Sequence, residues 1–183
     1  IGHSTGGGEV AHYIAKHGEA HVSKAVLVSA VPPLMVKTDK TPNGLPKEIF
    51  GVFQNQLFKN RAEFYRAIPE GPFYGFNRPD TKPSEPVIQN WWRQGMMGGA
   101  KAHYDGIVAF SQTDFTKDLK KISVPVLVLH GDDDQVVPFE ISGKLSAELV
   151  QNGTLKVYPG YSHGMLTINA DVINPDLLAF IQS

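Results

Sequence analysis

Hydrophobic and polar positions alternate along the chain in blocks that predict strands and helices in turn. Three segments predict strands, at 25–30, 124–129 and 154–158. The first two are continuously apolar, which is typical of parallel strands covered by helices on both faces. Helical segments lie before, between and after the strands, at 9–17, 138–150 and 177–181. Strands that alternate with crossover helices predict an α/β fold with a parallel, doubly wound sheet.

The segment 31–121 differs from the rest of the chain. Nine prolines, the first at Pro32 and the last at Pro86, divide its first part into short pieces. Aromatic helical stretches follow one another in it, at about 49–65, 87–97 and 100–110. No strand pattern is evident there. We therefore predict one α/β domain, with a core formed by 1–30 and 122–183 and a helical cap, or lid, inserted at 31–121.

Three predicted strands are few for an independent domain of this class, and the chain opens at Ile1 inside a glycine-rich turn. We therefore expect part of a longer protein, with further N-terminal strands before Ile1. We also expect the 183 residues alone to be poorly soluble or inactive, because the strand at 25–30 would lack a neighbour on one side.

Composition and charge exclude several classes of protein. The net charge is −1, so no excess of positive charge predicts nucleic acid or an anionic membrane as a partner. The absence of cysteine excludes disulfides and a thiolate nucleophile. No apolar run is long enough to cross a bilayer. Together these features favour a cytoplasmic protein without fixing the compartment, and they leave a homo-oligomer open.

The opening turn carries the first candidate for catalysis. Gly2-His3-Ser4-Thr5-Gly6 matches Gly-x-Ser-x-Gly, in which the serine occupies a strained turn between a strand and a helix. Small residues are required two positions to either side because chain segments pack closely there. The turn exposes the hydroxyl, and the backbone N–H of Thr5 becomes a donor for an oxyanion. The alternative is a glycine-rich turn with an ordinary serine.

A serine hydroxyl needs a base, and the base needs an orienting carboxylate. The loop 130–138 offers three acids, Asp132, Asp133 and Asp134. It follows a predicted parallel strand, and open α/β sheets place their sites at that end of the strands. The alternative is a solvated acidic loop that caps the next helix, a part that Asp132 or Asp133 could take.

His163 follows the third predicted strand and completes the chain order serine, acid, histidine that this kind of turn requires. We interpret the other six histidines as structural or solvated, namely His3, His12, His17, His21, His103 and His130. No metal site is predicted, because His12 and His17 are five positions apart and do not share a helix face.

Longer stretches then resemble a known family. They are Gly-His-Ser-Thr-Gly-Gly-Gly-Glu-Val at 2–10, Ala-Val-Leu-Val-Ser-Ala-Val-Pro-Pro at 25–33, Gly-Pro-Phe-Tyr-Gly-Phe-Asn-Arg at 71–78, Trp-Trp-Arg-Gln-Gly-Met-Met-Gly at 91–98, and the acid and His163 loops. The sequence is similar to the cofactor-free (non-heme) haloperoxidases and related aryl esterases of the α/β-hydrolase superfamily. This resemblance implies the C-terminal part of an α/β-hydrolase fold. The family pattern His-Gly-x-x-Asp-x-x-Val-Pro places the catalytic acid at Asp134.

The resemblance also implies a reaction. Ser4 would attack an ester carbonyl while His163 takes its proton and Asp134 orients the imidazole, giving an acyl-enzyme. Water resolves this intermediate, or hydrogen peroxide does so and gives a peracid that oxidises halide away from the protein. Neither a metal nor another cofactor is implied. Relatives have a His-Gly loop that supplies the second oxyanion donor, and this loop is absent from the chain.

Aromatic and apolar side chains of the cap and the acid loop are the candidate substrate pocket, namely Phe73, Trp91, Trp92, Met96 and Val137. They favour a small acyl group or an aromatic ester, although many of them could instead hold the cap helices to the core. Two alternatives stay open. One is another chemistry of the same fold, a lactonase or an acyltransferase. The other is a non-catalytic hydrolase scaffold that binds a ligand.

Overall fold

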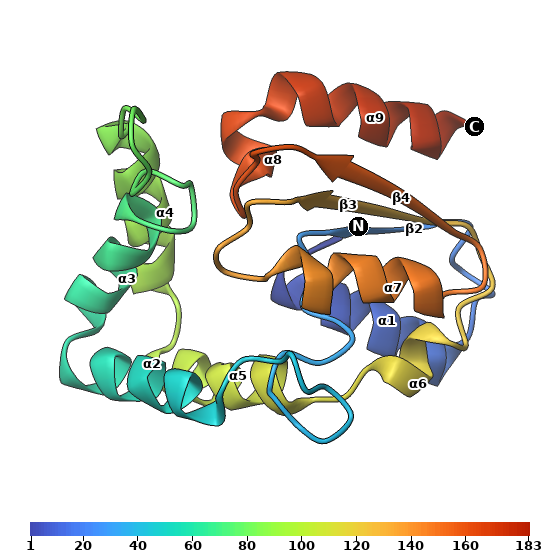
Figure 1. The fold of residues 1–183 in the computed structure, drawn as a ribbon, viewed down its shortest axis with the longest axis horizontal. Coiled ribbons are helices and arrows are strands. Elements are labelled where there is room, and N and C mark those ends of the chain that lie inside the picture. Colours follow the sequence, from blue (N-terminus) through green and yellow to red (C-terminus); the bar gives the residue numbers. More distant parts are fainter.

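A parallel sheet of four strands forms the centre of the computed structural model, which describes residues 1–183 (Figure 1). The strands are β1 (Gly2–His3), β2 (Ala25–Val28), β3 (Val126–Gly131) and β4 (Gly153–Tyr158), and they lie side by side in that order. All three pairings are parallel. Their carboxyl ends therefore meet along one edge, where the loops that follow β1, β3 and β4 come together.

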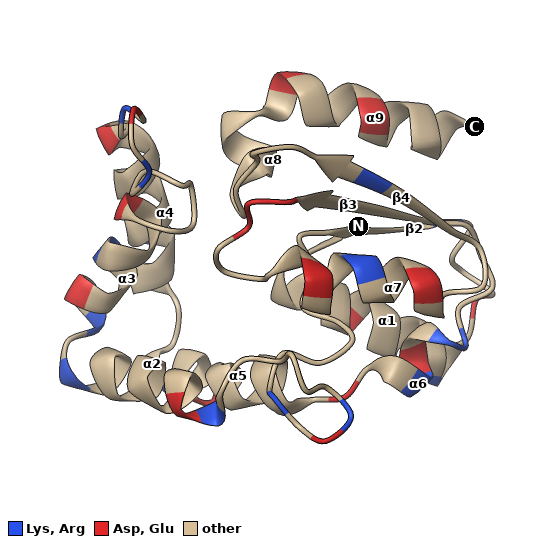
Figure 2. Ribbon diagram, viewed as in Figure 1, with Lys and Arg blue, Asp and Glu red and all other residues tan.

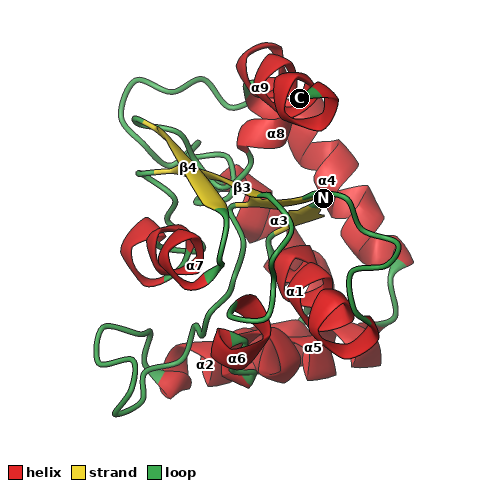
Figure 3. Ribbon diagram, turned by 90° about the vertical axis from the view of Figure 1, so that its right-hand side faces the viewer, coloured by secondary structure: helices red, strands yellow, loops and turns green.

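Helices cover both faces of the sheet, as the sequence predicts. Helices α1 (Thr5–His17) and α7 (Gly143–Leu149) lie on one face, and α8 (Met165–Ile168) and α9 (Ala170–Gln182) on the other (Figures 1 and 3). Side chains of a strand point alternately to the two faces. In β2, Leu27 therefore belongs to the hydrophobic cluster with α1, whereas Val28 belongs to the cluster with α8 and α9.

Only helices occur between β2 and β3, apart from two isolated bridges. They are α2 (Lys47–Lys59), α3 (Arg61–Glu70), α4 (Glu85–Met97), α5 (Ala100–Gln112) and α6 (Thr116–Leu119). Helices α3 and α4 stand beside the loop end of the sheet (Figure 1). A separate hydrophobic cluster around Phe50, Leu57 and Ile107, here called the cap cluster, joins these helices to one another and to Val137 of the loop after β3. The cap boundaries at 31 and 121 stay a prediction. None of the chain's helices has the length and hydrophobicity of a transmembrane span.

Several elements differ from the sequence prediction. The two residues of β1 are too few to produce a hydrophobic period, so this strand was not predicted. The predicted helix at 49–65 is two helices, because the chain turns at Asn60, whose side chain accepts the N–H of Glu63 at 3.3 Å. The predicted helix at 138–150 is a 3-10 turn, η1 (Phe139–Ile141), followed by α7.

The free edge of the sheet is also not where the sequence placed it. We expected the strand at 25–30 to lack a neighbour, but β2 pairs with β1 on one side and β3 on the other. The edge strands of the sheet are β1 and β4, so the unpaired edge on this side of β2 belongs to β1. Beside it lies a depression of about 400 Å³, lined mainly by residues of β1 and α1 that include Val10, Tyr13 and Ile14. Apolar surface therefore lies at this edge, one strand farther out than expected.

Close packing of α1 on the sheet gives a first prediction. A methyl group added at Gly7 would lie 2.3 Å from the Cβ of Ala30, whereas one added at Gly51 in α2 meets no atom within 4 Å. In the full-length protein, Gly7→Ala should lower the free energy of unfolding by about 1–3 kcal/mol through overpacking. The matched control Gly51→Ala should leave it unchanged or raise it slightly. Equal urea unfolding curves for the two variants would contradict the close contact.

Candidate active site

Ser4 occupies the turn between β1 and α1, with a backbone φ of 55° and ψ of −122°. A non-glycine residue at positive φ is strained. The turn is held because the Ser4 N–H donates to the Val28 carbonyl at 3.0 Å, and the Ser4 carbonyl accepts from the N–H groups of Gly7 and Val31 at 3.1 Å. A methyl group at Gly2 would lie 2.4 Å from the Gly6 carbonyl oxygen. The crowding predicted around the serine therefore applies to Gly2.

Gly6 does not share this crowding, because a methyl group there would meet no atom of the chain within 4 Å. Thr5 is the first residue of α1, so its N–H has no acceptor within the helix. This N–H directly follows the nucleophile candidate. The sequence-predicted donor thus lies at a helix N-terminus, where backbone N–H groups favour negative charge.

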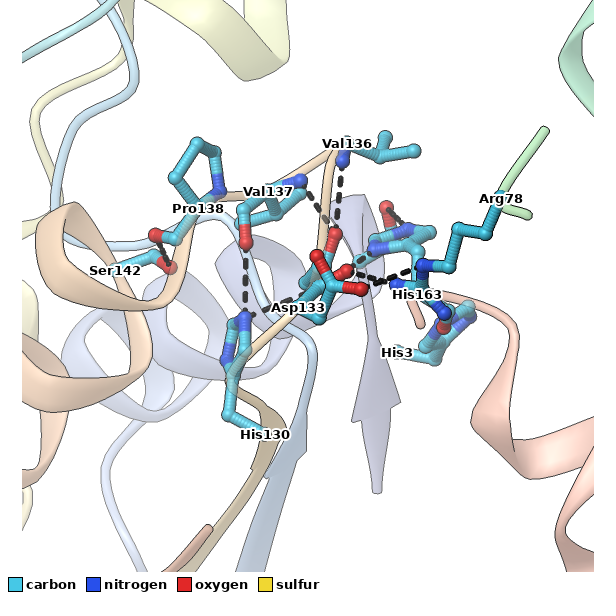
Figure 4. A network of polar contacts seen from close by, with 11 residues as sticks. His3, Arg78, His130, Asp133, Val136, Val137, Pro138, Ser142 and His163 are labelled. Carbon is cyan, nitrogen blue, oxygen red and sulfur yellow. Dashed lines mark hydrogen bonds and ion pairs between the residues drawn. The ribbon is translucent and has the colours of Figure 1, made fainter. Parts of the chain in front are cut away.

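The structure brings Ser4, Asp134 and His163 together. The Nε2 of His163 lies 2.9 Å from the Oγ of Ser4, and its Nδ1 lies 2.8 Å from the Oδ2 of Asp134. Both Asp134 and His163 are buried. Figure 4 shows His163 next to the loop that follows β3, and Figure 2 marks this loop as acidic. Three loops from three strands therefore contribute one continuous line of hydrogen bonds.

The charge of Asp134 decides the direction of these bonds. Its Oδ1 accepts the N–H groups of Val136 and Val137 at 2.9 and 2.8 Å. Burial alone would raise the pKa of Asp134, but the hydrogen bonds with His130 and His163 outweigh it and hold this pKa well below its usual range. An ionised carboxylate only accepts. The Nδ1 of His163 therefore carries the proton, and Nε2 is free to accept the hydroxyl of Ser4.

The neighbouring acids, Asp132 and Asp133, bind groups other than the imidazole of His163. The Oδ1 of Asp132 accepts the N–H of Gly160 at 2.6 Å, which joins the acid loop to the loop of His163. The carboxylate of Asp133 forms an ion pair with Arg78, with 2.5 Å between Oδ2 and Nε. Neither side chain is hydrogen-bonded to His163 or caps the next helix, so Asp134 alone of the three candidate acids has the position that orientation of the imidazole requires.

Two histidines that we interpreted as structural or solvated contact this group of residues. The Nε2–H of His130 donates to the Val137 carbonyl at 2.9 Å and lies 3.4 Å from the Oδ2 of Asp134. The Nε2–H of His3 donates to the His163 carbonyl at 3.0 Å. Burial and, second, the nearby imidazole of His163 lower the pKa of His3 from 6.5 to about 4. The sequence does contain a signal for these contacts, because His3 directly precedes Ser4 and His130 begins the acid loop at 130–138.

The predicted pocket residues separate into two groups. Phe73 lies edge-on to the imidazole of His163, with 4.9 Å between ring centroids, and edge-on to Trp91 at 5.4 Å. Trp92 instead donates its indole N–H to the Ala62 carbonyl at 2.9 Å and so joins α4 to α3. Met96 packs on the cap cluster, as Trp91 and Trp92 also do, and Val137 is buried in it. The contacts thus favour Phe73 and Trp91 as pocket residues.

No group of three or more histidine, aspartate or glutamate side chains is arranged to hold a metal ion. The polar side chains around Ser4 are instead joined by hydrogen bonds among themselves and to the backbone. In chemical terms the arrangement offers a hydroxyl, a base that can accept its proton, and a buried carboxylate that fixes the base.

Comparison with known proteins identifies the family of the chain. A profile of the alpha/beta hydrolase fold family matches residues 1–169. A bifunctional esterase/perhydrolase of Acinetobacter calcoaceticus is 73% identical over 183 residues, which are 100% of this chain and 66% of the relative. A non-heme haloperoxidase of Rhodococcus erythropolis is 61% identical over 183 residues, which are 100% of this chain and 67% of the relative. The crystal structure of a bromoperoxidase from Bacillus anthracis superposes with a TM-score of 0.93 at 37% identity, covering 100% of this chain and 66% of that one.

The chain thus spans about two thirds of the length of these relatives. Its parallel sheet agrees with the profile match. The chain belongs to the α/β-hydrolase fold family and, within it, to the group of non-heme haloperoxidases and esterases.

Proposed function

We propose that the protein is a serine-dependent esterase and perhydrolase that acts through an acyl-enzyme. One observation carries the proposal, namely the unbroken line of hydrogen bonds from Ser4 through His163 to Asp134. The similarity to an esterase/perhydrolase and to a non-heme haloperoxidase supports the same reaction.

In the proposed mechanism, Ser4 Oγ attacks the carbonyl carbon of an ester while Nε2 of His163 takes the hydroxyl proton. The charge of Asp134 stabilises the imidazolium that forms. The N–H of Thr5 stabilises the oxyanion. His163 then returns the proton to the leaving alcohol, and the acyl group remains on Ser4.

The acyl-enzyme has two proposed acceptors. Water gives the carboxylic acid, and hydrogen peroxide gives the peracid; in both cases His163 takes a proton from the acceptor and returns it to Ser4. The peracid then transfers an oxygen atom to halide in solution, which gives hypohalite and the carboxylic acid. Phe73 and Trp91 place aromatic surface next to the imidazole, and this surface supports small acyl groups or aromatic esters as substrates.

In the full-length protein, the role of Ser4 is tested by covalent labelling and the role of Asp134 by substitution. The wild type should be labelled at Ser4 by a fluorophosphonate and should hydrolyse p-nitrophenyl acetate. Asp134→Asn should slow hydrolysis by about four orders of magnitude, because an amide does not stabilise the imidazolium and permits the wrong tautomer. Asp105→Asn, at an exposed ion pair in α5, is the matched control. A wild type that is not labelled would contradict the proposal.

The shared acyl-enzyme is tested with peroxide. Raising the peroxide concentration should increase the peracid at the expense of the carboxylic acid, because both products arise from one intermediate. Ser4→Ala and His163→Ala should therefore lose both products in parallel, as measured by chromatography of acid and peracid. Peracid formation that persists in Ser4→Ala would mean that peroxide reacts by another route.

His3 gives a prediction about pH. Its pKa is about 4 in the folded protein and 6.5 for an unperturbed histidine, so the unfolded state binds the proton more tightly. The corresponding stability is present above pH 6.5 and is lost as the pH falls towards 4, by at most about 3 kcal/mol. The pKa of Asp134 is lowered from 3.8, so the stability that its charge contributes is lost only at a pH below the range in which His3 titrates.

The measurement is urea unfolding between pH 4 and 7. His3→Gln keeps a donor for the His163 carbonyl but does not titrate, so it should flatten the loss of stability in this window. His21→Gln, at an exposed position, is the control and should retain the wild-type slope. Equal slopes for His3→Gln and the wild type would show that His3 is not the titrating group.

A further inference from the structure

The hydrogen bond between Asp134 and His163 lies beyond the end of the sheet. The ladder between β3 and β4 ends at the pair Gly131 and Tyr158. Past that pair, Asp132 joins the two loops through its bonds to Tyr158 and Gly160. A site that must be held within about 0.5 Å requires further support from neighbouring residues, so contacts that span both loops are of interest.

One side chain from the inserted segment spans both loops. Arg78 donates through Nη2 to the carbonyl of Asp133, directly before Asp134, and through Nη1 to the carbonyl of Gly160 at 3.3 Å. Its Nε also pairs with the carboxylate of Asp133 at 2.5 Å. Figure 4 shows Arg78 reaching from its own loop towards Asp133 and His163. One guanidinium therefore binds the acid loop and the histidine loop together.

The neighbours of Arg78 in the chain contact the same two loops. The carbonyl of Phe73 accepts the N–H of Gly164 at 2.7 Å, and the ring of Phe73 packs edge-on against the imidazole of His163. The Nδ2 of Asn77 donates to the Oε1 of Gln135 at 2.9 Å. The segment 73–78 thus contacts each loop through at least two residues.

Gly75 permits this arrangement. Its φ is +71°, and a methyl group there would lie 2.4 Å from Nη1 of Arg78. The guanidinium therefore folds back over its own segment into space that only glycine leaves free. Arginine suits the position because its planar group is always charged and presents several donors in a fixed geometry.

We propose that Arg78 is a positioning residue, which holds the acid and histidine loops at the separation that the bond between Asp134 and His163 requires. This inference rests on the proposed function. The side chains of Arg78 and Asp133 are 20% and 48% exposed, so solvent screens their ion pair and limits its contribution to stability. We therefore expect removal of Arg78 to affect the geometry of the proposed reaction more than the stability of the fold.

The test compares Arg78→Ala and Arg78→Lys with wild type in the full-length protein. Arg78→Ala should lower kcat for p-nitrophenyl acetate by roughly 10- to 100-fold, the size expected for a misplaced reacting group. KM should change little, because in this proposal Arg78 acts through the two loops and not on the substrate. Arg78→Lys keeps the charge but cannot bind both carbonyls with one planar group, so its kcat should also fall. Arg93→Ala is the control, since the hydrogen bond of the Arg93 side chain goes to Asn90 of its own helix.

A second readout distinguishes positioning from a general structural role. The proton between Nδ1 of His163 and Asp134 gives a far-downfield NMR resonance when the bond is short. This resonance should shift upfield or broaden in Arg78→Ala and stay unchanged in Arg93→Ala, with similar melting temperatures for all. Arg78→Gln, which keeps amide donors, takes the place of Arg78→Ala if that variant does not fold.

The outcomes separate this inference from the proposed function. An active wild type with an Arg78→Ala variant of equal kcat and unchanged resonance would overturn the positioning role alone. A wild type that neither hydrolyses esters nor reacts with a fluorophosphonate would overturn the proposed function first. A loss of kcat that follows a loss of melting temperature, with an unchanged resonance in the folded fraction, would also count against Arg78 as a positioning residue.

Discussion

The proposed reaction depends on keeping one carboxylate charged inside the protein. The side chain of Asp134 is fully buried, and a buried charge is costly unless hydrogen bonds compensate for lost hydration. Two backbone N–H groups and two imidazoles face its oxygens. These donors come from the end of β3, the loop that follows it and the loop after β4. The charge on Asp134 therefore requires the loops to stay together.

This requirement couples stability to chemistry. If the loop of His163 moved away, Asp134 would lose a donor, and Ser4 would lose its base at the same time. The contacts that hold the loops, through Asp132, Arg78 and the backbone of Phe73, do not touch the substrate carbonyl in the proposed mechanism. They still bear on the proposed mechanism, because they hold the loop on which the imidazole lies.

The sequence was sufficient for the parts of the molecule that have a local signal. The apolar runs of β2 and β3 predicted the parallel sheet, and chain order together with family resemblance selected the three residues that the structure brings together, although their catalytic role stays a prediction. The strand β1 was not predicted because its two residues are too few to show an alternation of hydrophobic and polar positions. Arg78 was missed because its acceptors lie 55 and 82 residues away, and no local pattern records which distant carbonyl a side chain will bind.

The segment 73–78 limits how the inserted region can vary. Phe73 contacts the imidazole of His163 with its ring and the loop of His163 with its carbonyl, so a change in its packing moves the proposed base as well as the pocket wall. Trp91, in α4, contacts Phe73 but forms no hydrogen bond to either loop. A change in α4 can therefore reach the proposed base only through Phe73, whereas a change in 73–78 acts on the loop of His163 directly.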